Sequence, residues 1–152
     1  MKATPIVFDA TVAVDALLRP QGPAGSLVRR FLELREFELV STEALLEEIH
    51  LAATDPKVLA CLDLDAAEVE RWVVALGVLA TLVDAPGDGT GQDCEEPALA
   101  AAAAAGEAVV ATLDPVLLAR PPSESFEAVR PEVLLEVLEA RGAAEASLGR
   151  AI

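Results

Sequence analysis

The chain alternates short apolar segments with longer stretches of helical periodicity, and this alternation limits the fold more than any other feature. Strands that alternate with helices at this spacing are joined by right-handed crossovers and form parallel sheets. We therefore expect an α/β fold with a parallel sheet covered by helices. The expected strands lie at residues 4–8, 37–41, 81–83, 108–111 and 126–129.

The helical segments have recognisable ends. Thr42 and Asp65 stand where they can cap the helices that follow them, Pro97 suits a first helical turn, and Gly106 suits a helix end. The expected helices cover residues 12–18, 24–35, 43–53, 66–79, 97–105 and 131–140, with a short one after 55–56. We expect one domain over residues 1–141 and an Ala- and Gly-rich tail over residues 142–152.

Length and composition limit the classes of protein to which this chain could belong. A chain of 152 residues, 53% of them hydrophobic, is enough for one domain with its own core. No apolar run reaches the ~18 residues of a membrane span, and the start is unlike a signal peptide, so we expect a cytoplasmic protein. Cys61 and Cys94 are far apart and suggest reduced thiols. His50 is the only histidine, which argues against His-rich metal centres.

The formal net charge of −15 weighs against a protein that binds nucleic acid chiefly through phosphate contacts. The one basic cluster is Arg29, Arg30 and Arg35. Arg29 and Arg30 are candidates for contact with a nucleic-acid backbone, but a solvated helix face is their simpler interpretation. An acidic surface favours basic partners and metal ions instead.

Acidic side chains occur where the expected strands end. Because the carboxyl ends of parallel strands share one edge of a sheet, we expect the carboxylates that follow strands, or begin neighbouring helices, to gather there. Such a group repels itself unless a cation compensates it, and Mg²⁺ or Mn²⁺ prefers oxygen ligands. The acids concerned are Asp9, Glu47, Glu48, Asp93, Glu95, Glu96 and Asp114.

A simpler interpretation exists for most of these acids. Asp93, Glu95, Glu96 and Asp114 can cap helices and complement the helix dipole. Glu47 and Glu48 can belong to a solvated face. Asp9 is harder to explain in this way, because it ends a hydrophobic strand. The joint placement of the acids carries the argument for a metal site.

Four segments of the chain resemble the PIN-domain family and, within it, the VapC-type toxins. Their order and spacing carry the resemblance, which extends from about Ile6 to Leu138. It implies a three-layer α/β/α sandwich with about five parallel strands in the order 3-2-1-4-5, and a metal-dependent ribonuclease site. The segments are Val7–Val12 (VFDATV), Leu39–Ile49 (LVSTEALLEEI), Glu96–Ala101 (EPALAA) and Val109–Asp114 (VVATLD).

The resemblance also implies roles for individual residues. Asp9 would be the first metal ligand with Thr11 as its hydroxyl neighbour, Glu48 the helical glutamate, and Asp114 the acid that closes the fourth strand. Glu96 or Glu95 would be the third acid. The family usually has aspartate at that position, so a longer glutamate changes the metal geometry.

Two functions of different classes remain. The first is an endoribonuclease that hydrolyses RNA phosphodiesters with Mg²⁺ or Mn²⁺ held by Asp9, Glu48, Glu96 (or Glu95) and Asp114. The second is a PIN-fold binding module without catalysis, which acts through a homodimer or a protein partner such as an antitoxin. The scant basic surface and the high apolar content favour the second function.

Overall fold

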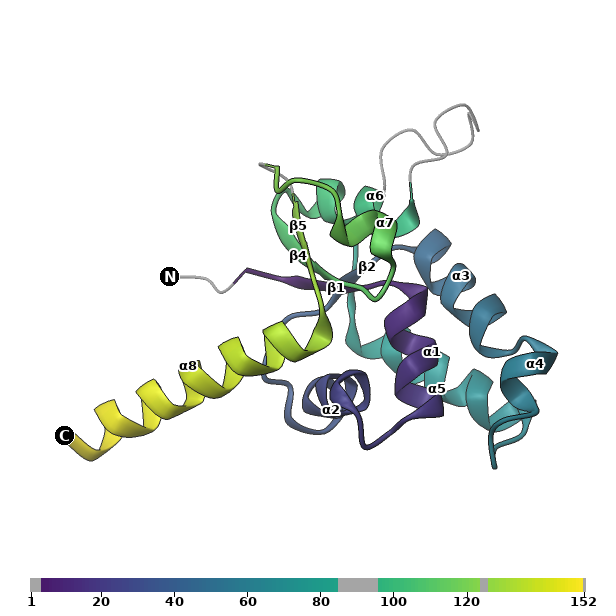
Figure 1. The fold of residues 1–152 in the computed structure, drawn as a ribbon, viewed down its shortest axis with the longest axis horizontal. Coiled ribbons are helices and arrows are strands. Elements are labelled where there is room, and N and C mark those ends of the chain that lie inside the picture. Colours follow the sequence, from purple (N-terminus) through teal and green to yellow (C-terminus); the bar gives the residue numbers. More distant parts are fainter. Residues whose placement is uncertain (1–3, 85–95, 124–125, 152) are drawn as a thin grey trace.

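The fold is described from a computed structural model, which covers residues 4–84, 96–123 and 126–151 and the side chains as far as residue 145 (Figure 1). The strands are β1 (Ile6–Phe8), β2 (Val40–Ser41), β3 (Thr81–Leu82), β4 (Ala108–Ala111) and β5 (Phe126–Val129). The helices are α1 (Ala10–Leu18), α2 (Pro23–Arg29), the π-helical η1 (Arg30–Leu34), α3 (Glu43–Ala53), α4 (Pro56–Leu59), α5 (Ala66–Leu79), α6 (Pro97–Ala105), α7 (Pro115–Leu118) and α8 (Pro131–Ala151).

All strand pairs in the described residues are parallel, as expected, but they do not form one sheet. One sheet has three strands in the order β1-β4-β5, and the other pairs β2 with β3. A single parallel bridge between Ile6 and Leu39 links the two sheets, with the Ile6 N–H donating to the Glu38 carbonyl at 2.9 Å. The largest sheet therefore has fewer strands than the predicted five, because β1 and β2 share only one rung of the ladder.

Side chains of the central strands pack on both of their faces. Val7 and Val110 belong to a core cluster with buried residues of α3, α5 and α6. Ile6 and Phe8 belong to a second cluster, with residues of α2 and α8. This alternation follows from the period of two in a strand. The structure is thus a mixed α/β fold with small parallel sheets and several helices, and its central strands β1 and β4 are largely buried.

The predicted helix ends agree well with the structure at α3, α5 and α6. Thr42 caps α3 by accepting the Leu45 N–H at 3.1 Å. Asp65 caps α5 within a capping box, in which Glu68 returns the hydrogen bond. α6 begins at Pro97 and ends before Gly106, whose φ of 91° suits glycine. Capping residues therefore located these ends correctly.

Two helices differ from the expectation. The helix predicted over residues 24–35 is divided into α2 and η1, which ends at Arg35 in a left-handed conformation with φ 51°. The last helix runs on to Ala151, past the predicted end at Ala140, and projects from the rest of the fold (Figure 1). The Ala, Glu, Leu and Arg residues of this segment are strong helix formers and outweigh Gly142. The short α7 was not predicted.

No helix in the described part of the chain combines the length and the apolar character needed to cross a membrane.

Candidate functional site

Asp9 is held at the end of β1 by both its backbone and its side chain. Its N–H donates to the Ala111 carbonyl of β4 at 3.2 Å, so the residue continues the pairing of β1 with β4. Its Oδ1 accepts the Val12 N–H at 3.1 Å and thereby caps α1. Asp9 is only 4% exposed. The simple capping interpretation is thus correct for Asp9, although a cap alone does not require a buried carboxylate.

Two threonine hydroxyls donate to the Asp9 carboxylate from opposite sides. Thr11 Oγ1 donates to Oδ1 and Thr112 Oγ1 donates to Oδ2, each at 2.5 Å. Thr11 Oγ1 accepts the Leu113 N–H at 2.9 Å, and Thr112 Oγ1 accepts the Asp114 N–H at 3.0 Å. The loop after β4 is therefore tied to Asp9 through two hydroxyl groups. Each hydroxyl has one proton, and both protons are used on this carboxylate.

Three of the other predicted acids, Glu48, Glu96 and Asp114, lie on three further segments. Glu48 lies on α3, Glu96 immediately precedes α6, and Asp114 caps α7 by accepting the Val116 N–H at 2.9 Å. Glu48, Glu96 and Asp114 are partly buried. The four carboxylates therefore come from four separate segments of the chain.

Three of the four carboxyl groups have raised pKa values, and the charges of neighbouring acids contribute to two of these shifts. Burial, opposed by the hydrogen bonds from Thr11 and Thr112, raises the pKa of Asp9. Burial raises the pKa of Glu48, and the charges of Glu96 and Asp9 raise it further. Burial, then the charges of Asp114 and Asp9, raise the pKa of Glu96, while Arg120 lowers it. Like charges in a partly buried place are the pattern that a bound cation relieves.

The fit of a metal ion to these residues is good in ligand type but loose in spacing. All four groups are carboxylates, the ligands of a hard divalent cation. Within residues 4–84, 96–123 and 126–151, however, no three acidic, His or Cys side chains form a group that could hold one ion. Mg²⁺ usually keeps several waters and is bound by only one or two carboxylates. The described residues therefore supply the type of ligand that such an ion prefers, but no group of three that could hold it.

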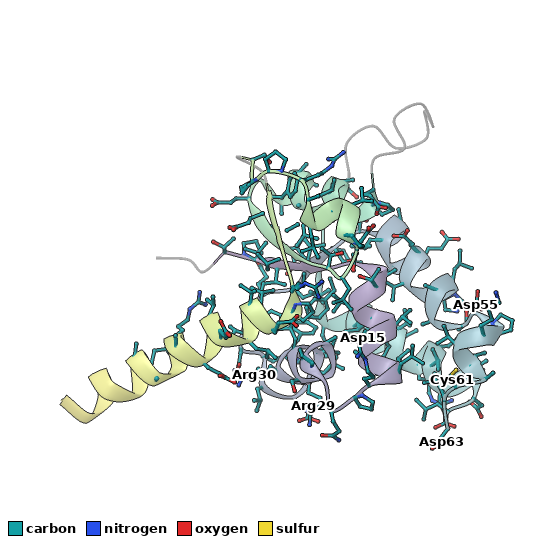
Figure 2. The ribbon with its side chains drawn as sticks, viewed as in Figure 1. Asp15, Arg29, Arg30, Asp55, Cys61 and Asp63 are labelled. Carbon is teal, nitrogen blue, oxygen red and sulfur yellow. The ribbon has the colours of Figure 1, made fainter. Side chains whose placement is uncertain are left out.

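Several predicted residues do not join this group. Glu47 is exposed on α3. Arg29 and Arg30 lie around α2 (Figure 2), where Arg29 donates to Ser26 and Arg30 pairs with Glu36 and Glu139. The basic cluster is thus engaged with its own neighbours. Asp93 and Glu95 lie outside the described residues, so Glu96 is the one of these three acids whose place the structure describes.

Sequence reasoning missed two residues of the site. Thr112 is fully buried and links Asp9 to the backbone of Asp114. A polar residue at the end of an apolar strand, two positions before Asp114, was the signal available in the sequence. Arg120 follows α7 and brings positive charge near Glu96. Nothing in the sequence marks Arg120, because its place depends on the unpredicted α7.

The raised pKa values predict that the metal-free protein becomes more stable on mild acidification. A carboxyl whose folded pKa lies above its unfolded value stabilises the fold fully below about pH 4, and this contribution is lost as the pH rises through the folded pKa. Asp9, Glu48 and Glu96 all have this sign. Thermal unfolding in EDTA should show a higher Tm near pH 5 than at pH 7.5, and Glu96→Gln should reduce that difference. An unchanged difference in Glu96→Gln would contradict the assignment.

Comparison of the chain with protein-family models, with curated proteins and with solved structures gave no significant match.

Proposed function

We propose that this chain is a metal-dependent endoribonuclease of the PIN type, which hydrolyses RNA phosphodiesters with Mg²⁺ or Mn²⁺. The observation that supports it best is the coupling of four carboxylates from four separate segments: Asp9, Glu48, Glu96 and Asp114. Two threonines fix the most buried of them. Capping alone requires neither the convergence nor the buried hydroxyl network.

The fold supports the same proposal. If the Ile6–Leu39 bridge is counted as a strand contact, the order of the five strands is β3-β2-β1-β4-β5. Core clusters on both faces of the central strands support the three-layer α/β/α arrangement that the resemblance to PIN domains implies. The site lies where sites occur in such folds, beyond the carboxyl ends of the central strands.

In the proposed mechanism, Asp9, Glu48, Glu96 and Asp114 would hold the metal ion, directly or through water. When bound, the ion supplies activation of water and stabilisation of charge on the phosphate. Thr11 and Thr112 hold the Asp9 carboxylate in one orientation and leave only lone pairs facing outward. Arg120 offers positive charge beside Glu96, where a phosphate of the substrate would pass.

The direct test of this function is cleavage of single-stranded RNA by the purified protein with Mg²⁺ or Mn²⁺. We expect internal cleavage that EDTA stops and added Mn²⁺ restores. Absence of cleavage with both metals across several RNA sequences, together with no metal binding at millimolar concentration, would overturn the proposal.

A binding module is the second candidate, and the outer face of α5 favours it. Val74 and Val78 lie one turn apart on α5 and are 61% and 73% exposed. With Ala67, Glu70 and Arg71 they line an open hollow of about 630 Å³. Large exposed aliphatic side chains of this kind are typical of protein interfaces. Since Glu70 and Arg71 carry opposite charges on this face, a second copy of the chain is a suitable partner.

Val78→Glu should convert such a dimer into a monomer. A charge on the apolar face would lose its water on association without gaining a partner, which costs several kcal/mol. Light scattering after size exclusion measures the change. Leu51→Glu is the matched control, because Leu51 is 63% exposed on α3. A wild-type monomer that binds a separate protein through this face would assign it to a partner such as an antitoxin.

A further inference from the structure

A second hollow adjoins the acidic site. It has a volume of about 340 Å³ and lies between α1, α3 and the segment after β4. This volume is near the lower end of the range for small-ligand pockets, about 300–1,000 Å³, and suits one compact group rather than an extended ligand. The residues that line it and bear on its chemistry are Thr11, Val14, Asp15, Leu18, Ala52 and Leu113.

Thr11 and Leu113 connect this hollow to the acidic site. Thr11 lines the hollow, while its hydroxyl donates to Asp9 and accepts the Leu113 N–H. Leu113 lies between Thr112, which donates to Asp9, and Asp114. A group in the hollow is therefore separated from the central carboxylate by a single side chain. If RNA is cleaved at the proposed metal site around Asp9, the part of the RNA next to the cleaved phosphate would lie in this hollow.

The chemistry of the lining selects a neutral, largely apolar group with hydrogen-bond donors. The walls are mostly aliphatic, and no Lys or Arg lines the hollow within the described residues, so a phosphate has no partner there. Asp15 is the charged member, 13% exposed at its side chain (Figure 2), and Arg19 contacts its Oδ1. The second carboxylate oxygen has no hydrogen bond within the described residues. A carboxylate oxygen of this kind accepts from the amino group of a base such as cytosine.

We propose that this hollow binds one unpaired, amino-bearing nucleobase of the RNA strand, next to the phosphodiester that is cleaved. The inference rests on the proposed ribonuclease function, and it adds the part of the substrate that the chain recognises. Single-stranded RNA presents its bases in this way, because unpaired bases can leave the stack and enter protein pockets. The aliphatic side chains of this open hollow lie against one face of the base, and Asp15 distinguishes an amino group from a carbonyl.

The test is a titration of the metal-free protein with cytidine, adenosine and uridine, followed by the amide signals of Val14, Ala52 and Leu113 in ¹H–¹⁵N NMR spectra. We expect saturable shifts with cytidine or adenosine and weaker ones with uridine. Ala52→Leu should reduce the affinity by about tenfold or more, because the larger side chain occupies the hollow. Ala140→Leu, the same change at an exposed position of α8, should leave the affinity unchanged.

The outcomes separate this inference from the function on which it rests. If nucleosides shift these signals but the protein cleaves no RNA, the pocket stands and the nuclease proposal fails. If RNA is cleaved and no nucleoside shifts them, the pocket proposal is overturned. It is also overturned if Ala52→Leu binds nucleosides as the wild type does, or if only N-acetyl-leucinamide, a mimic of an apolar protein side chain, produces the shifts.

Discussion

Asp9→Asn should abolish RNA cleavage and weaken Mn²⁺ binding by at least about 100-fold, the upper end of the loss seen when groups supporting a metal ligand are removed. The amide has nearly the shape of the carboxylate but lacks its charge. Asp9 is the most buried of the four acids and interacts electrostatically with Glu48 and Glu96. Calorimetric titration with Mn²⁺ measures the binding, and a gel assay measures the cleavage.

The same variant should still fold in the absence of metal, although its amide has one acceptor oxygen where the carboxylate has two, so one of the two threonine hydroxyls loses its acceptor. Burial raises the pKa of Asp9, so the ionised carboxylate destabilises the fold at neutral pH, and a neutral amide removes this cost. Asparagine also remains a good helix cap. Asp65→Asn is the control, because Asp65 caps α5 in the same manner at an exposed position. Full Mn²⁺ affinity in Asp9→Asn would exclude the proposed mechanism.

Thr112→Val should destabilise the protein by about 3 kcal/mol, although the two side chains have almost the same shape. The change removes the donor to Asp9 Oδ2 and the acceptor for the Asp114 N–H at a fully buried position. A buried carboxylate and an amide then both lose a hydrogen bond. Chemical denaturation at pH 7 measures the change in the free energy of unfolding.

Thr112→Ser distinguishes the contribution of the Thr112 hydroxyl from the contribution of its methyl group. Serine keeps both hydrogen bonds and loses one methyl group, so it should cost about 1 kcal/mol. It should also retain most of the Mn²⁺ affinity, whereas Thr112→Val should lose it together with stability. If serine and valine have equal effects on metal binding, Thr112 is only a packing residue and does not position Asp9.

Local signals explain why much of the fold was predictable. The ends of α3, α5 and α6 follow from Thr42, Asp65 and Pro97, because a capping side chain or a proline acts within its own turn. The apolar segments over β4 and β5 gave those strands their correct bounds. The division of the strands into two sheets was not predictable, because it depends on how many rungs β1 and β2 share.

The proposed members of the candidate site could be chosen from the sequence, but their geometry could not. Strand ends and helix starts pointed to Asp9, Glu48, Glu96 and Asp114, and in the structure the charges of neighbouring members of this set act on Glu48 and Glu96. Thr112 looked like an ordinary strand residue, since its importance comes from pairing between β1 and β4, segments about a hundred positions apart. Among the described residues, no three acidic, His or Cys side chains form a group that could hold one ion. This spacing also depends on the tertiary fold and could not be predicted from the sequence.

The hydrogen bonds to the Asp9 carboxylate all have this carboxylate as their acceptor. From the amide of Leu113 through the Thr11 hydroxyl, and from the amide of Asp114 through the Thr112 hydroxyl, every proton is directed toward the carboxylate. Such chains polarise each member, so the dipoles strengthen one another at their common end. These dipoles are oriented in the folded chain before any ligand arrives, and a cation that met the free face of Asp9 would require no rotation of either hydroxyl.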